Sequence, residues 1–261
     1  MYDFAALEAA LAGTAFAGKL HFSSVTRSTN TDALEAARVG APHGSVYFAD
    51  EQSAGRGRGD HKWESHAGQG LYVSVVLRLP LAAERVHLLP LAAGLAAIEA
   101  IHAASEVRAD LRWPNDLLLG ARKAGGILVE SKLEGNALAY AVAGIGINVH
   151  QQSFDPELAT AATSLDLAAG RAVDRQELLV CLLKSLERET RALLDERAAA
   201  AIPVRVEAAS TWVRGRRVEV HGPQACVGVT AGLDADGFLR VETASEIVTV
   251  RTGGIRAAKA G

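Results

Sequence analysis

The chain has 261 residues, 49% of them hydrophobic, and a formal net charge of −3 at pH 7. This length can bury one full core and still carry a small second domain. The negative charge argues against a general nucleic-acid binder, because such proteins need a basic face to neutralise phosphates.

Hydrophobic periodicity and turn residues predict alternating helices and strands over roughly the first 150 residues. Residues 29–39 are expected to form a helix capped by Ser28 and Thr29, whose small hydroxyl side chains favour that position. An alanine-rich helix is predicted over 82–104, interrupted by Pro90. The other elements predicted here are a helix over 3–12 and strands over 20–25, 44–49, 71–79, 107–113, 117–119, 126–133 and 137–149.

The later part of the chain changes character. A short helix is predicted over 163–168 and one long amphipathic helix over 175–200, with a leucine stripe that indicates core packing. After about residue 209 short strands and tight turns follow, over 217–221, 226–233, 238–243 and 246–251, with a hairpin turn at 234–237. The pattern predicts an α+β fold: a mixed sheet with packed helices over 1–208, then a small β-barrel over 209–261.

Residues 55–63, Gly-Arg-Gly-Arg-Gly-Asp-His-Lys-Trp, form the first unusual segment. Its alternate glycines allow the backbone to approach a ligand closely. Arg56 and Arg58 offer planar donor forks for phosphate or carboxylate oxygens, Lys62 adds a compact charge, and Trp63 offers a flat face for a base or ring. The alternative is a solvated basic turn. The segment is not a P-loop, because the terminal Gly-Lys-Ser/Thr is missing.

Lys123 is the second unusual feature. It lies between the polar turn Trp113-Pro114-Asn115-Asp116 and a glycine pair, Gly125-Gly126, that opens an apolar strand. The pattern predicts a hairpin. A lone lysine here would ordinarily be a snorkelling surface residue, but the two glycines leave room for a ligand beside it. The two segments together indicate an enzyme that handles an anionic phosphate group.

These motifs lie in a characteristic order over roughly residues 20–150. They are Ser28-Thr29-Asn30, Glu51-Gln52-Ser53-Ala54-Gly55-Arg56-Gly57-Arg58, Lys62-Trp63, Leu71-Tyr72-Val73-Ser74, Trp113-Pro114-Asn115-Asp116, Lys123 to Glu130, and Gly144-Ile145-Gly146-Ile147-Asn148-Val149. In order and spacing they resemble the biotin protein ligase family. The resemblance implies a class II aminoacyl-tRNA synthetase-like catalytic fold followed by an SH3-like β-barrel. It also implies biotin–[acetyl-CoA-carboxylase] ligase activity, in which ATP and biotin give biotinyl-5′-AMP and pyrophosphate before transfer to one carrier lysine.

The resemblance also implies roles for the matching residues. Lys123 and Arg58 are the expected catalytic residues, with Lys123 stabilising charge beside the biotin carboxylate and the α-phosphate. The expected biotin-binding residues are Ser28, Thr29, Asn30, Gln52, Gly55, Arg56, Arg58, Lys123, Gly125 and Gly126. The expected ATP-binding residues are Arg56, Arg58, Lys62, Trp63, Asn115, Asp116, Lys123, Asn148 and, by a looser match, Arg256. Gly59, Asp60 and His61 stand where some relatives carry further arginines, so the contacts of that stretch stay open.

ATP and biotin are the expected substrates, and Mg²⁺ is expected to arrive with ATP, because no metal cage is visible in the sequence. The expected partner is the biotin carboxyl carrier protein of acetyl-CoA carboxylase; DNA and membrane partners are not expected, and a homodimer is possible. Cys181 and Cys226 are predicted to be free thiols rather than a disulfide or zinc site. Without a leader, and without an apolar stretch of about 20 residues, the protein is predicted to be cytoplasmic.

Three alternative functions fit the sequence less well. A bifunctional ligase and repressor would need a winged helix-turn-helix, and only about twenty residues precede the first predicted core strand. A non-catalytic biotin sensor could lose Lys123 or the arginine loop, and this chain keeps both. A lipoate protein ligase would share the fold and the acyl-adenylate chemistry, but the Gly-Arg-Gly-Arg-Gly and Trp-Pro-Asn-Asp pattern favours biotin.

Overall fold

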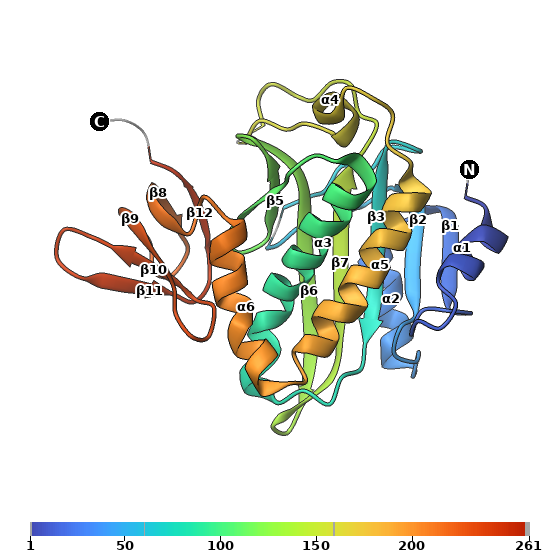
Figure 1. Ribbon diagram of the computed structural model, residues 1–261, viewed down its shortest axis with the longest axis horizontal. Helices are drawn as coiled ribbons and strands as arrows, with labels where there is room; N and C mark the ends of the chain where they lie inside the picture. The colour runs from blue at the N-terminus through green and yellow to red at the C-terminus, as the bar shows by residue number, and fades with distance from the viewer. Residues whose placement is uncertain (1, 60, 159, 259–261) are drawn as a thin grey trace.

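A computed structural model of the chain describes residues 2–59, 61–158 and 160–258. Its larger part is a seven-stranded mixed sheet, in which only the β1–β2 pair is parallel. The strands in spatial order are β1 (Leu20–Thr26), β2 (Val46–Gln52), β3 (Gly70–Leu77), β7 (Ala137–Asn148), β6 (Arg122–Glu134), β5 (Asp116–Leu119) and β4 (Asp110–Arg112). The predicted mixed sheet with packed helices is confirmed (Figure 1).

The two faces of this sheet are covered by different helices. Because strand side chains alternate between faces, Val75, Ala143 and Ile145 join the main core under α3 (Leu89–Ser105) and α5 (Arg175–Ala192). The opposite face carries α2 (Thr29–Arg38), packed in a smaller cluster. α2 covers only part of that face, and a large cavity lies beyond its first turn.

The prediction of one long helix over 175–200 is wrong. The structure has two helices there, α5 and α6 (Glu196–Ala209), separated at 193–195. The Asp195 side chain accepts a hydrogen bond from the Ala198 amide at 2.8 Å and so caps a new helix. The leucine stripe itself is buried as predicted: Leu178, Leu179, Leu182, Leu183, Leu186 and Leu193.

The predicted interruption at Pro90 is confirmed. A 3₁₀ helix, η1 (Ala83–Leu88), precedes α3, and Pro90 lies in the first turn of α3, where its missing N–H costs no hydrogen bond. The remaining helices of this part are α1 (Phe4–Ala10) and α4 (Leu165–Ala169).

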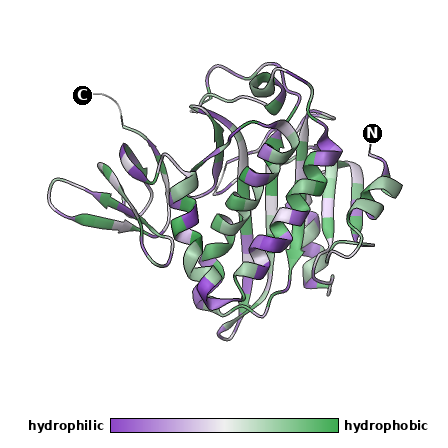
Figure 2. Ribbon diagram, viewed as in Figure 1, coloured by the Kyte–Doolittle hydropathy of each residue, from purple (hydrophilic) through white to green (hydrophobic). Residues whose placement is uncertain are grey.

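The stretch Ala83–Ser105 contradicts the expectation that no segment is apolar enough to cross a bilayer. By length and composition alone it is, with a mean hydropathy of 1.5 over an 18-residue window. However, 61% of that window is buried, and α3 packs beside α5 and against strands of the large sheet. Figure 2 shows α3 as largely hydrophobic and α5 as banded with hydrophilic residues. A buried core helix passes the same test, so the stretch is only weak evidence for a membrane span.

The smaller part is a five-stranded antiparallel sheet, consistent with the predicted small barrel. Its strands in spatial order are β11 (Ile247–Val250), β10 (Leu239–Glu242), β9 (Cys226–Leu233), β8 (Arg214–His221) and β12 (Gly254–Ala257). The turn at 234–237 is confirmed, with Gly237 at φ +83°. β12 was not predicted, and it brings the chain back to the larger part. The domain boundary at 208/209 stays a prediction.

Candidate active site

A cavity of about 1220 Å³ opens on the α2 side of the large sheet. Its walls come from the start of α2, the segment around 56–64, the turn at 113–116, strands β6 and β7, and the connection after β7. Residues 221–223 and 252–256 of the small sheet close one side. Segments far apart in sequence therefore meet around one cavity that is open to solvent.

Nearly all the predicted site residues line this cavity. They are Ser28, Thr29, Asn30, Gln52, Arg56, Arg58, Lys62, Trp63, Asn115, Asp116, Lys123, Gly126, Asn148 and Arg256. Gly55 and Gly125 do not line it. A methyl group at Gly55 would come 2.2 Å from the Trp63 carbonyl oxygen, and one at Gly125 would come 2.8 Å from that of Gly146. These two glycines permit close backbone packing behind the cavity wall.

At one end of the cavity, a network of neutral polar groups surrounds the start of α2. The Gln52 side-chain oxygen accepts from the Thr29 amide at 2.9 Å and from the Thr29 hydroxyl at 3.1 Å, while the Gln52 nitrogen donates to Ser65 Oγ at 2.7 Å. The Thr29 and Ser74 hydroxyls share a 2.9 Å hydrogen bond. Ser28 is the N-cap residue by backbone, but the predicted side-chain cap is wrong, since its hydroxyl makes no capping bond. Gln52 satisfies the helix terminus instead, and Ser28 lines the cavity.

Arg56 is held by an acidic residue on β6. Its guanidinium donates two 2.9 Å hydrogen bonds to Glu130, which also accepts from Asn30 Nδ2 at 2.6 Å. The pair joins the glycine-arginine segment to the sheet. Glu130 was absent from the predicted site, although an acid beside apolar Ile127-Leu128-Val129 was a signal that could have identified it.

Lys123 lies in β6 with its ammonium 2.5 Å from one oxygen of Asp116, and Arg112 is 2.7 Å from the other oxygen. Burial alone would raise the pKa of Asp116, but Lys123 and Arg112 outweigh it and hold this pKa below its ordinary value. Asp116 therefore stays ionised and fixes the lysine. Arg112 was missed, although its i,i+4 spacing to Asp116 is visible in the sequence.

A β-bulge allows Lys123 and Gly126 to face the same cavity. The β5–β6 register shifts between Leu117 and Leu118, which pair with Gly125 and Lys123. The extra residue places Ala124 and Gly125 away from the cavity and lets positions three apart share one face. Bulges of this kind re-aim side chains, here the lysine.

The Trp63 indole covers a floor of glycines. A methyl group at Gly126 would come 3.4 Å from the ring, and one at Gly146 would come 2.7 Å from its nitrogen. The Lys123 ammonium is 5.5 Å from the ring centroid. The indole nitrogen is buried and has no hydrogen-bond acceptor among the described residues. Adenine stacking on Trp63 stays a prediction.

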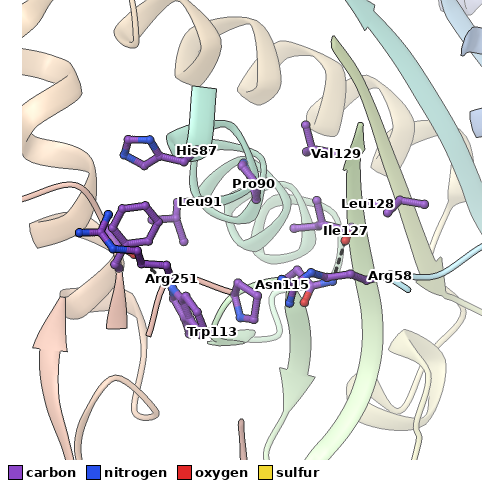
Figure 3. A pocket seen from close by; sticks show the side chains of 13 residues that line it. Arg58, His87, Pro90, Leu91, Trp113, Asn115, Ile127, Leu128, Val129 and Arg251 are labelled. Carbon is purple, nitrogen blue, oxygen red and sulfur yellow. Dashed lines mark hydrogen bonds between the residues drawn. The ribbon is translucent and has the colours of Figure 1, made fainter. Parts of the chain in front are cut away.

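Arg58 connects the larger part to the smaller one. Its guanidinium donates to Thr252 Oγ1 at 3.0 Å and to the Gly253 carbonyl. Burial lowers the pKa of Arg58. Arg58 and Asn115 also border a second cavity of about 190 Å³ between the two sheets, with Arg251 on its far side (Figure 3).

The remaining predicted positions are distributed as follows. Gly59 and His61 line the cavity, and the Gly57 amide donates to the His61 carbonyl at 2.7 Å. Asp60 lies outside the described residues. Within the described ranges, no group of three or more His, Cys, Asp and Glu side chains could hold a metal ion. Both cysteines are free, as predicted.

Comparison with known proteins agrees with this architecture. Residues 22–148 match the Biotin/lipoate A/B protein ligase family. The chain is 34% identical over 238 residues to the biotin–[acetyl-CoA-carboxylase] ligase of Mycobacterium tuberculosis, covering 88% of this chain and 85% of that protein. It is 40% identical over 171 residues to the bifunctional ligase/repressor BirA of Bacillus spizizenii, covering 63% of this chain.

Among solved structures, a biotin protein ligase from Aquifex aeolicus in complex with biotin and ATP matches with a TM-score of 0.77 at 28% identity. The match covers 92% of this chain and 98% of that one. The solved structure therefore matches both parts of the fold. In contrast, the chain spans only 53% of the length of the Bacillus proteins, about half.

Proposed function

This chain belongs to the biotin protein ligase family, and we propose that it activates biotin with ATP and transfers the biotinyl group to a lysine of the biotin carboxyl carrier protein of acetyl-CoA carboxylase. One observation carries the proposal: a single cavity holds a neutral polar network at one end and a paired lysine farther along. At about 1220 Å³ it exceeds the roughly 300–1,000 Å³ of ordinary ligand pockets, so it has room for two substrates.

The neutral network suits the ureido ring of biotin. Hydroxyls and a carboxamide both donate and accept hydrogen bonds, so they can satisfy the N–H and C=O groups of a urea without adding charge. Ser28, with its hydroxyl free of the helix cap, is available for such a contact. The valerate chain would then run over the glycine floor and place the carboxylate at Lys123.

In the first step, a biotin carboxylate oxygen attacks the α-phosphorus of MgATP. The bond from that phosphorus to the pyrophosphate oxygen breaks, and biotinyl-5′-AMP and pyrophosphate form. Lys123 stabilises the negative charge that develops on the α-phosphate. In the second step, the amine of the carrier lysine attacks the acyl carbon, an amide forms, AMP leaves and the amine loses a proton to water.

The other substrates and partners follow from this reaction. Mg²⁺ enters with the nucleotide rather than in a preformed site, since Asp116 is already paired with two cations. We place the reaction in the cytoplasm and without a DNA or membrane partner. The homodimer stays a prediction.

The test is biotin-dependent exchange of labelled pyrophosphate into ATP, followed by transfer to a purified carrier domain. Biotin should support exchange and lipoate should not. Exchange with lipoate that equals or exceeds exchange with biotin would overturn the assignment in favour of a lipoate ligase.

A further inference from the structure

Gln151 lies in the cavity wall just after β7. It is not one of the predicted site residues. The residue is 7% exposed and lines the cavity. The side-chain oxygen is buried and has no hydrogen-bond donor among the described residues. An unpaired buried carbonyl costs about 1–3 kcal/mol, so a free acceptor on a residue that lines a substrate cavity needs an explanation.

The neighbouring hydrogen bonds fix which atom of the amide is free. Asn148 Nδ2 donates to the Thr163 carbonyl at 3.1 Å, so Asn148 presents its oxygen to Gln151, whose Nε2 donates to it at 3.4 Å. The Gln151 backbone carbonyl is held by Ser164 Oγ at 2.7 Å. The side-chain oxygen is therefore the remaining atom.

The position of Gln151 along the cavity identifies the substrate that it meets. β3 and β7 pair Ser74 with Gly144 at the neutral network and Gly70 with Asn148 at the other end. Asn148 is four residue steps along the strand from Gly144, about 13 Å at a rise of ~3.3 Å per residue. Gln151 follows Asn148 and so lies away from the ureido end, on the nucleotide side.

The chemistry of a carbonyl oxygen limits which substrate groups can pair with it, because it only accepts hydrogen bonds and needs a donor. Carboxylate and phosphate oxygens carry no proton to donate at neutral pH, so neither satisfies it. A nucleoside does, through a ribose hydroxyl or the exocyclic amine of adenine. Resting on the proposed function, we infer that the Gln151 side-chain oxygen accepts a hydrogen bond from the nucleoside of ATP and makes Gln151 a specificity-determining residue.

The experiment measures the KM values for ATP and biotin in pyrophosphate exchange with the parent, Gln151→Leu and Gln152→Leu. Gln152 is the matched control, because it is exposed and its Nε2 bonds only to the His150 carbonyl. Gln151→Leu should raise the KM for ATP about tenfold, the equivalent of one lost hydrogen bond. Its KM for biotin, and both values in Gln152→Leu, should stay within about twofold of the parent.

Nucleotide analogues identify the donor and separate direct contact from an effect through Asn148. The analogues are 2′-deoxy-ATP, 3′-deoxy-ATP and the purine riboside triphosphate that lacks the 6-amino group. One of them should be roughly tenfold poorer with the parent yet no poorer than ATP with Gln151→Leu, because both changes remove the same bond. Losses that multiply for every analogue would overturn the inference.

Two further outcomes keep the proposals apart. A parent enzyme indifferent to all three analogues would overturn the inference even if Gln151→Leu fails to fold. A parent without any biotin-dependent exchange would instead overturn the proposed function.

Discussion

Individual side chains at this site are held in position by partners that are distant in the sequence. Lys123 and Asp116 were predicted because they lie in recognisable motifs, whereas Glu130, Thr252 and Gln151 were not predicted to be site residues. Arg56 and Glu130 are 74 positions apart, and Arg58 and Thr252 are 194 apart. The spacing of residues along one helix or strand can reveal neighbours three or four positions apart. It cannot reveal partners that are 74 or 194 positions apart.

Replacing Lys123 with Ala should slow adenylate formation by on the order of 100-fold or more, because the charge opposite the developing negative phosphate is lost. The assay is biotin-dependent pyrophosphate exchange. The control is Lys132→Ala, an exposed lysine on the same strand, which should stay within about twofold of the parent. Near-normal exchange in Lys123→Ala would remove Lys123 from the catalytic role.

The lowered pKa of Asp116 leads us to expect that the stability of the fold depends on pH. Burial raises its pKa, but Lys123 and Arg112 outweigh this and lower the pKa below the unfolded value, near 4. A group lowered in this way stabilises the fold above its unfolded pKa, and the contribution is lost as pH falls through the folded pKa.

Asp116→Asn should therefore reduce the free energy of unfolding by about 2 kcal/mol at neutral pH, since two cations lose their partner. Urea denaturation of parent and variant between about pH 7 and pH 2 measures the difference. We expect the difference to shrink below about pH 4. A difference that stays constant across this range would contradict the linkage.

At the scale of elements, periodicity located most helices and strands, and the errors have local physical causes. The pattern of apolar residues continues through Leu193, so it could not show that Asp195 starts a second helix. β12 is four residues long and rich in small side chains, and it exists because β8 offers it a partner. The bulge at Ala124 depends on register with β5, which no single-strand pattern contains.

The glycine-arginine segment is the element expected to change most when substrates bind. Its backbone freedom costs entropy on ordering, and it is joined to the sheet mainly through side chains such as Arg56. Saturating biotin and ATP should slow tryptic cleavage after Arg56, Arg58 and Lys62, and should raise the melting temperature. Cleavage after Arg171, exposed in a different loop, provides the reference rate. Equal protection at both places would indicate general stabilisation rather than closure of this segment.

At the scale of the whole molecule, the small sheet completes the cavity. Residues 252–256 line it, and Thr252 and Gly253 hold Arg58 across the junction. The sequence predicted a small barrel, an arginine loop at the site and, by a looser match, a nucleotide contact from Arg256 of the barrel, but not the contact of Arg58 with Thr252 and Gly253. Such contacts arise from the packing of two parts, so only the three-dimensional structure can show them.

This contact leads to a prediction about retention of the reactive intermediate. Biotinyl-5′-AMP is a mixed anhydride that reacts with any exposed amine, so a ligase must hold it until the carrier lysine arrives. Arg58→Gly should still make the adenylate but release it faster, and bystander proteins in a lysate should then become biotinylated.

If Thr252 positions Arg58, Thr252→Val should show the same labelling more weakly, because the isosteric side chain cannot accept the guanidinium hydrogen bond at 3.0 Å. Thr252→Ser restores the hydroxyl and should label only the carrier, like the parent. A blot of the lysate with biotin, ATP and each enzyme provides the comparison. Labelling by Thr252→Ser as broad as that by Thr252→Val would show that the hydroxyl is not what holds Arg58, and clean labelling by Arg58→Gly would show that retention depends on other residues, with Arg56 and Lys62 the next to replace.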